Sequence, residues 1–153
     1  MYEVVRRLGK GGSGLIFLAN HRETAQAVAL KQVCPADAEE LALVKNEIAL
    51  TMHSNHPNIL TYYETYEDKN QIWMVVELME GCLYELIAQR KRIPERQIAF
   101  ILHEILQGLC FIHRQHRIHR DMKSDNVLID CYGSIKLGDF GFAAQLTLSL
   151  IHI

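Results

Sequence analysis

The stretch that decides the fold of this chain is His119-Arg120-Asp121-Met122-Lys123-Ser124-Asp125-Asn126, followed one predicted hairpin later by Asp139-Phe140-Gly141. Asp121 is a candidate acceptor for a hydroxyl proton, and Lys123 can neutralise charge that develops on a phosphoryl group. Asn126 and Asp139 offer the oxygen ligands that Mg²⁺ prefers. The two motifs together indicate a site that holds magnesium and a phosphoryl group.

The composition limits the class of protein. The chain has 153 residues, 49% of them hydrophobic and 22% charged, which suits one folded core rather than a disordered segment. A net charge of −2 gives no electrostatic footprint for nucleic acid or an anionic membrane. No apolar run is long enough to span a bilayer, and no signal peptide is visible. The dispersed cysteines (Cys34, Cys82, Cys110 and Cys131) are expected to be reduced thiols of a cytosolic or nuclear protein, and we take the cytoplasm as its location.

Hydrophobic periodicity changes near Gly81. Before it, β-type runs predict strands over 2–8, 15–19, 27–31, 59–66 and 72–78, with turns at 9–14 and 68–70. Apolar residues three and four apart predict one helix over 41–52. After it, the pattern predicts a short helix over 83–90, a long helix from Pro94 with an apolar stripe at 98, 101, 102, 105, 109 and 112, and a hairpin of 127–129 with 134–137. The predicted class is α+β.

The glycine-rich stretch 9–14 fits the pattern G-x-G-x-x-G. A dinucleotide-binding turn would open a helix and carry an acidic residue about 20 positions later. Here β-type runs flank the glycines, and the later residues are Lys31 and Gln32. The pattern favours a hairpin lid in which the backbone at Gly9, Gly11 and Gly14 approaches the phosphates of ATP. An ordinary glycine turn is the alternative.

Lys31 ends the apolar strand predicted over 27–31 and is a candidate partner for the α- and β-phosphates. Such a lysine needs a carboxylate that keeps it extended and charged. Glu47 lies on the polar side of the predicted helix 41–52, which can pack over the sheet. Each residue alone is typical of an exposed charge, and their joint placement indicates a pair.

These motifs resemble those of eukaryotic-type protein kinases over residues 2–147. Lys123 in the catalytic loop is the serine/threonine-kinase form. Asn46-Glu47-Ile48 and the segments 119–126 and 139–146 are most similar to the sterile-twenty group, particularly its p21-activated branch. The resemblance implies a two-lobed fold, with an antiparallel five-stranded amino-terminal lobe and hinge in 1–79 and an incomplete helical carboxyl-terminal lobe in 80–147.

The resemblance also implies cofactors, partners and further roles. ATP and Mg²⁺ are the implied cofactors, and the partner is a protein substrate with a serine or threonine acceptor. Regulation by a small GTPase or a scaffold would act through regions outside this chain, and no nucleic-acid or membrane partner is expected. The implied nucleotide contacts are Ile16, Ala29 and Leu128 around adenine, Glu77 to Met79 as the hinge, Val76 as gatekeeper, and Glu85 at the ribose. Arg120 is expected to contact the segment after Asp139, and Thr51 stands where the family usually has an apolar residue.

Three histidines, His113, His116 and His119, lie three residues apart and raise the alternative of a zinc site. The stretch runs from a predicted helix end into a loop, so the side chains need not share a face. No cysteine or carboxylate set of ligand spacing accompanies them. His119 is therefore expected to be a packed, hydrogen-bonded scaffold residue beneath Phe140.

A complete kinase domain continues beyond this chain through an A-P-E motif and further helices. We therefore expect the isolated chain to be inactive and prone to aggregate. The end, 148–153, equals the translation of CTGTCTCTTATACACATC, which resembles a transposase end used as a sequencing adapter. A foreign tail is the hypothesis, and a genuine truncated isoform is the alternative. The alternative function is a non-catalytic nucleotide-binding or decoy module, which would have no chemical need for Lys31, Asp121, Asn126 and Asp139 together.

Overall fold

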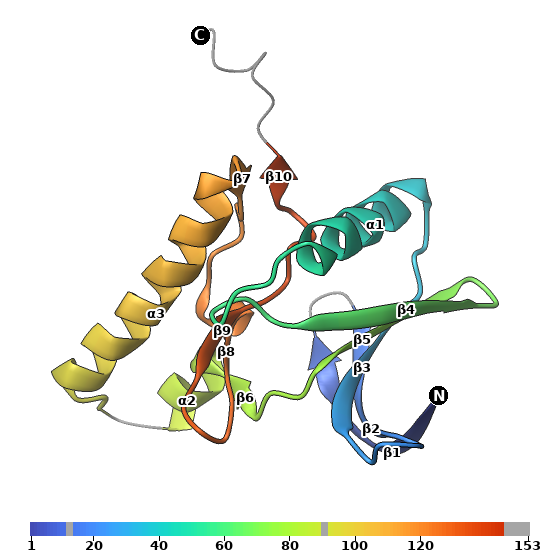
Figure 1. Cartoon of the computed structure of the whole chain (residues 1–153), viewed down its shortest axis with the longest axis horizontal. Helices are drawn as coiled ribbons and strands as arrows, with labels where there is room; N and C mark the ends of the chain where they lie inside the picture. The colour runs from blue at the N-terminus through green and yellow to red at the C-terminus, as the bar shows by residue number, and fades with distance from the viewer. Residues whose placement is uncertain (12–13, 90–91, 146–153) are drawn as a thin grey trace, which may run out of the picture.

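The computed structural model describes residues 1–11, 14–89 and 92–145. A five-stranded antiparallel sheet with one helix comes first, and helices with two small sheets follow it (Figure 1). This arrangement confirms the predicted α+β class. The tail hypothesis for 148–153 concerns residues outside the described part. None of the described helices has the length and apolarity that crossing a bilayer requires.

The large sheet has the strand order β1-β2-β3-β5-β4. Its strands are β1 (Tyr2–Gly11), β2 (Gly14–His21), β3 (Ala27–Val33), β4 (Tyr62–Asp68) and β5 (Gln71–Glu77). The register pairs Ile16 with Lys31 and Ala29 with Val76. Because side chains alternate along a strand, these four residues share one face of the sheet. The opposite face carries a separate apolar cluster, formed by Ala19, Val28, Leu30 and Val75.

Helix α1 (Ala38–Met52) packs on the sheet through Val44, which shares a buried cluster with Val33, Ile72 and Met74. The helix begins three residues before the predicted 41–52. Its N-cap is Asp37, whose carboxylate accepts the Glu40 N–H at 2.8 Å. An apolar pattern reports only the buried stripe, so it misses a first turn that a polar cap stabilises.

The largest differences from the predicted strand boundaries lie at β1 and β4. Strand β1 continues through Gly9 to Gly11 instead of ending at residue 8, and residues 12–13 lie outside the described part. The strand predicted over 59–66 begins only at Tyr62. Ile59 instead forms a parallel bridge with Leu137, and the Leu60 N–H donates to the Leu137 carbonyl at 2.9 Å. These apolar residues pair with a distant strand, which local pattern does not reveal.

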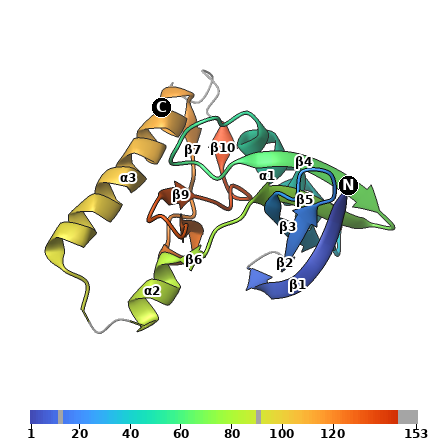
Figure 2. The same ribbon diagram turned by 60° about the horizontal axis from the view of Figure 1, so that its bottom comes forward.

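The part after the hinge is built from short elements. They are β6 (Gly81–Cys82), α2 (Leu83–Gln89), α3 (Glu95–Arg114), β7 (Arg117–Ile118), the 3-10 turn η1 (Ser124–Asn126), β8 (Val127–Ile129), β9 (Ile135–Leu137) and β10 (Ala144–Gln145). They form the sheets β6-β8-β9 and β10-β7. The turned view shows β7 and β10 between α3 and α1 (Figure 2). The two-residue strands β6, β7 and β10 were not predicted, because two residues carry no periodicity.

The predicted stripe of α3 is only partly buried. Ile101 and Ile112 are buried, whereas Ile98 and Leu102 are 44% and 52% exposed. The buried line runs through Gly108, where a Cβ atom would lie 2.9 Å from the Asn58 carbonyl oxygen. A glycine therefore lets α3 approach this backbone closely, and the residues beside the line face outward.

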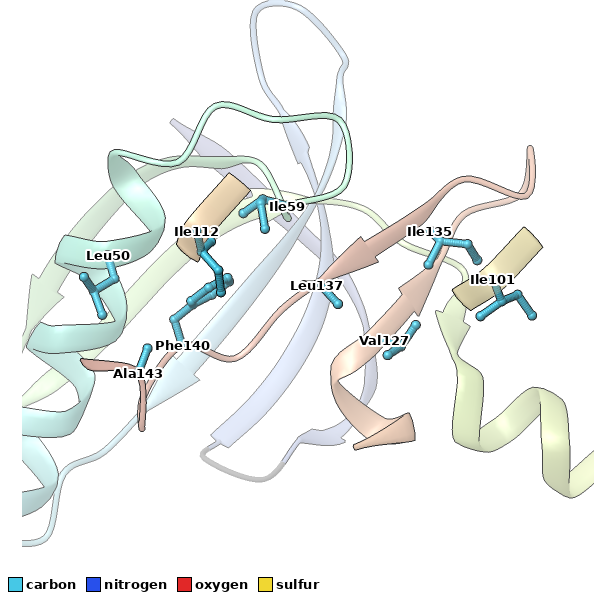
Figure 3. Packing of buried hydrophobic residues seen from close by; sticks show 9 residues of the cluster. All are labelled: Leu50, Ile59, Ile101, Ile112, Val127, Ile135, Leu137, Phe140 and Ala143. Carbon is cyan, nitrogen blue, oxygen red and sulfur yellow. The ribbon is translucent and has the colours of Figure 1, made fainter. Parts of the chain in front are cut away.

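The main core joins α1 to the later elements (Figure 3). Figure 3 shows Leu50 of α1, Ile112 of α3 and Ala143 gathered around Phe140, which is 2% exposed. The other core residues are Ile59, Ile101, Val127, Ile135 and Leu137. Burial of this cluster places the segment after Asp139 against the carboxyl-terminal half of α1.

Candidate active site

Lys31 and Glu47 form a buried ion pair between the sheet and α1. Lys31 Nζ donates to Glu47 Oε1 at 2.6 Å, and the two side chains are 14% and 7% exposed. Burial raises the pKa of the Glu47 carboxyl, and the Lys31 ammonium group opposes this rise. The Thr51 hydroxyl donates to the Glu47 carbonyl at 2.7 Å, within the same helix. The structure therefore brings together the two residues that the sequence pattern paired.

The catalytic-loop residues converge on the Asp121 carboxylate. Asp121 Oδ2 accepts from Lys123 Nζ at 2.7 Å and from Asn126 Nδ2 at 3.0 Å. The hydrogen bond from Lys123 holds the pKa of Asp121 below its usual range, and the same contact raises the pKa of Lys123. Asn126 Nδ2 also donates to the Asp121 carbonyl at 2.8 Å, so the amide oxygen of Asn126 points away from Asp121. The Asp121 carboxylate is thus held in its ionised form.

Asn126 and Asp139 lie on adjacent lengths of backbone. The Gly138 N–H donates to the Asn126 carbonyl at 3.0 Å, which places Asp139 one residue from this contact. Asp139 has a φ of 57° and Arg120 a φ of 64°, in the left-handed region that non-glycine residues rarely adopt. Such conformations cluster at functional sites. One amide and one carboxylate fit Mg²⁺, which usually takes few protein ligands beside water and phosphate oxygens.

The glycines of the predicted lid have different surroundings. A Cβ atom at Gly14 would lie 2.1 Å from the Gln32 carbonyl oxygen. The close packing of β2 against β3 is therefore a sufficient reason for a glycine at this position. At Gly9, by contrast, no atom lies within 4 Å of where a Cβ atom would stand. Gly9 is therefore free of such a packing requirement, and open space lies beside it. Gly11 ends β1 opposite Gly14 in the β1–β2 register.

The predicted adenine contacts come from two sheets. Ile16 and Ala29 lie on one face of the large sheet, and Leu128 lies on β8 beside Gly138. The β6-β8 pairing ties the chain after the hinge to Leu128, which is the register partner of Cys82. In the described chain, the strand register pairs Leu128 with neither Ile16 nor Ala29.

The predicted hinge is held at its start by one backbone hydrogen bond and one ion pair. The Glu77 N–H donates to the Thr61 carbonyl at 2.9 Å, and the Glu77 carboxylate pairs with Lys136 Nζ at 2.8 Å. Met79 is half-buried further along. The Glu85 carboxylate accepts the Cys82 N–H at 3.1 Å, so it caps the first turn of α2. A ribose contact by Glu85 stays a prediction.

His119 is a buried scaffold residue, as its place in the motif predicted. It is 1% exposed, and its ring centroid lies 4.7 Å from that of Phe140. Nε2 donates to the Gly138 carbonyl at 3.0 Å, while Nδ1 accepts the Asp121 N–H at 3.4 Å, which requires the neutral imidazole. Desolvation lowers the pKa of this histidine. Among the described residues, no three His, Cys, Asp or Glu side chains gather as metal ligands.

His119 should make the fold sensitive to mild acid. Because its pKa is lower in the folded chain than the ordinary value of about 6.5, the unfolded chain takes up the proton first. Below about pH 6.5 the free energy of unfolding should therefore fall, by up to about 1.4 kcal/mol per pH unit from this residue. Urea unfolding from pH 7 to pH 5 should show a flatter slope in His119→Gln than in wild type. His103→Gln, at a histidine whose side chain is 65% exposed, is the matched control for the loss of an imidazole, and equal slopes in His119→Gln and wild type would contradict the assignment.

The family model of the protein kinase domain matches residues 2–150. The chain belongs to the protein kinase family. The order Lys31, Glu47, Asp121, Asn126, Asp139 and the contacts that join these residues agree with this membership.

Similar curated proteins are serine/threonine-protein kinases, of the sterile-twenty and p21-activated type that the motifs predicted. The kinase pakA of Dictyostelium discoideum is 45% identical over 150 residues, covering 96% of this chain and 12% of that protein. CLA4 of Candida albicans is 39% identical over 151 residues, covering 96% and 16%. For pakC of Dictyostelium discoideum the identity is 37% over 151 residues, covering 96% and 31%. The chain thus spans less than a third of these kinases.

Side chains hold the carbonyl of Gly141, which ends the Asp-Phe-Gly motif of this kinase chain, and the carbonyls of the next two residues. Arg120 Nε donates to the Phe142 carbonyl at 2.6 Å, so the predicted contact of Arg120 with this segment is formed. Asn46 Nδ2 donates to the carbonyls of Ala143 at 2.8 Å and Gly141 at 3.2 Å. Sequence reasoning noted Asn46 only as part of the family resemblance and did not predict this contact. The sequence feature that pointed to Asn46 is its position one residue before Glu47.

Proposed function

We propose that the protein containing this chain is a serine/threonine kinase, which transfers the γ-phosphate of magnesium-bound ATP to protein hydroxyls. The observation that carries the proposal is the Asp121 carboxylate, held ionised by Lys123 at 2.7 Å and by Asn126 at 3.0 Å. The Asn126 carbonyl accepts the N–H of Gly138, the residue before Asp139, and we take these four side chains to act on one phosphoryl group. Family membership and the serine/threonine kinases among its relatives support the same reaction.

In this mechanism the substrate hydroxyl donates its proton to Asp121 as its oxygen attacks the γ-phosphorus. The new P–O bond forms while the bond to the β,γ-bridging oxygen breaks, and ADP leaves. Lys123, beside Asp121, offsets negative charge on the transferred group. Mg²⁺, when held by Asn126 and Asp139, would neutralise charge on the phosphate oxygens. Lys31, kept extended by Glu47, binds the α- and β-phosphates.

The nucleotide is proposed to lie between the two parts of the chain, which we take as a lobe over 1–79 and a lobe over 80–147. The backbone at Gly9, Gly11 and Gly14 covers the phosphates. Ile16, Ala29 and Leu128 contact adenine, and Glu77 and Met79 supply hinge backbone groups. Glu85 stands near the ribose. The open space beside Gly9 supports the first of these contacts.

The partners are proposed on the same basis. A protein with an accessible serine or threonine is the substrate, and the reaction takes place in the cytoplasm. Control by a small GTPase or a scaffold would use regions outside this chain. The p21-activated type of the relatives supports this last point, and those relatives are several times longer than the chain.

The full-length protein that contains this chain can test the proposal with ATP labelled at the γ-phosphate. Peptides with a single serine, threonine or tyrosine acceptor serve as substrates. We expect magnesium-dependent labelling of the serine and threonine peptides, lowered about 10²-fold in Lys31→Met, because one charge contact to the phosphates is lost. Lys45→Met, at an exposed lysine of α1, is the matched control. Nucleotide binding without labelling of any peptide would support the decoy module instead.

A further inference from the structure

Arg117 of β7 binds two separate segments with one half-buried guanidinium group. Its Nη1 donates to the Leu50 carbonyl at 3.2 Å and to the Ser54 hydroxyl at 3.2 Å, both at the carboxyl-terminal end of α1. Its Nε donates to Gln145 Oε1 at 3.0 Å, on β10. Figures 1 and 2 both show β7 between α3 and β10, close to α1. From the strand that leads to the 119–126 loop, one side chain thus contacts both the end of α1 and the segment after Asp139.

The contact with α1 supplies a charge that the helix lacks. The first turn of α1 carries Glu39 and Glu40, whereas its last turn has no basic residue. The last carbonyls of a helix hold partial negative charge and have no partner within the helix, so a cation is stabilising there. Arg117 brings that cation from another part of the chain.

The contact with Gln145 links Arg117 to strand β10, in the segment after Asp139. Arg117 and Gln145 are also register partners in the β7–β10 ladder, and Gln145 Nε2 donates to the Gln115 carbonyl at 2.9 Å. Closer to the motif, Asn46 of α1 holds the Gly141 and Ala143 carbonyls. The segment 141–145 is therefore tied to α1 directly through Asn46 and indirectly through Arg117.

Both ties act on the part of α1 that carries Glu47, the partner of Lys31 on β3. Leu50, whose carbonyl Arg117 binds, packs with its side chain in the Phe140 cluster. Glu47 lies one helical turn earlier and holds Lys31 at 2.6 Å. A shift of this end of α1 would carry Glu47 away from Lys31.

We propose that Arg117 is a positioning residue that couples the segment after Asp139 to the Lys31–Glu47 pair, by binding the end of α1 and Gln145 at the same time. This inference rests on the proposed function for the meaning of that pair. When β10 is in place, Arg117 holds α1 where Glu47 meets Lys31. When β10 is displaced, Arg117 loses its second anchor and α1 is held less firmly.

The test measures hydrogen exchange and the affinity for a fluorescent ATP analogue with Mg²⁺, in the full-length protein. Arg117→Met should speed exchange of the amides in 47–54 and 141–145 while the large sheet and α3 keep their protection. It should also weaken analogue binding about five- to tenfold, the size of a typical coupling between sites. Arg117→Lys keeps the charge at α1 but cannot fork to Gln145, so it should restore protection in 47–54 and not in 144–145. Arg114→Met, at an exposed arginine of α3, should change neither readout.

The outcomes separate this proposal from the proposed function. Faster exchange throughout the chain in Arg117→Met would mean a general role in stability and would overturn the coupling. Unchanged affinity in Arg117→Met beside weakened binding in Lys31→Met would overturn it as well, with the proposed function intact. Unchanged affinity in Lys31→Met would contradict the phosphate-binding role of the pair, while local loss of protection in Arg117→Met would still support the coupling between segments.

Discussion

Asp121→Asn is expected to lower the rate of phosphoryl transfer by about 10²–10⁴-fold, the usual contribution of a positioned acid–base group. An amide cannot accept the hydroxyl proton, and it also removes the charge that Lys123 pairs with at 2.7 Å. The Asp121 carboxylate does not hold ATP in the proposed mechanism, so the affinity for ATP should change by less than about twofold. Steady-state kinetics with a serine peptide, together with analogue binding, measure both effects on the full-length protein.

Asp125→Asn is the matched control for this experiment. Asp125 lies in the same loop, in η1, and its side chain is exposed. The same change of carboxylate to amide should leave the rate close to that of wild type. If Asp121→Asn and Asp125→Asn lose activity equally, or if Asp121→Asn keeps most of its rate, Asp121 is not the proton acceptor.

The second large effect is expected on stability. Phe140→Ala should lower the free energy of unfolding by about 3–5 kcal/mol, because truncation of a buried aromatic leaves a cavity. Phe140 is 2% exposed, lies 4.7 Å from His119 between ring centroids, and belongs to the core that joins α1 to the later elements. Urea unfolding followed by circular dichroism gives the value, provided that the transition is two-state.

A phenylalanine two residues away offers the control. Phe142 is 51% exposed, and its carbonyl rather than its ring binds Arg120. Phe142→Ala should therefore change the free energy of unfolding by no more than about 0.5 kcal/mol. A similar loss in both variants would show that the segment after Asp139 contributes to stability through something other than the burial of Phe140.

The elements with strong local patterns were predicted well. The strands around Ala29 and Val75 follow from continuous β-type apolar runs, and the body of α1 follows from apolar residues three and four apart. Both signals depend only on neighbouring residues. The strand boundaries at β1 and β4 differ from the prediction because pairing with another segment of the chain sets them. Ile59 is apolar because its side chain is buried in the core, and its backbone bridges Leu137 instead of joining β4. Strand β1 runs on through its glycines because β2 pairs with it as far as Gly14. Neither partner is visible from local spacing.

The candidate site shows the same division. The motif residues Asp121, Asn126 and Asp139 were found because their chemistry depends on residue type and order. Asn46 and Arg117 were missed as contacts, since an amide or a guanidinium group has a partner only where the fold supplies one. Arg117 meets Leu50 across 67 residues of chain, and no periodicity predicts such a contact.

The sequence by itself determined the family and the candidate reacting groups, because the proposed phosphoryl transfer needs particular side chains in a particular order. Tertiary structure decided how these groups are held. The packing of α1 on the sheet brings Glu47 to Lys31, and burial of Phe140 sets the segment after Asp139 against α1. The physical reason is that ion pairs and core contacts between distant residues form only when burial and backbone pairing have placed them within a few ångströms of each other.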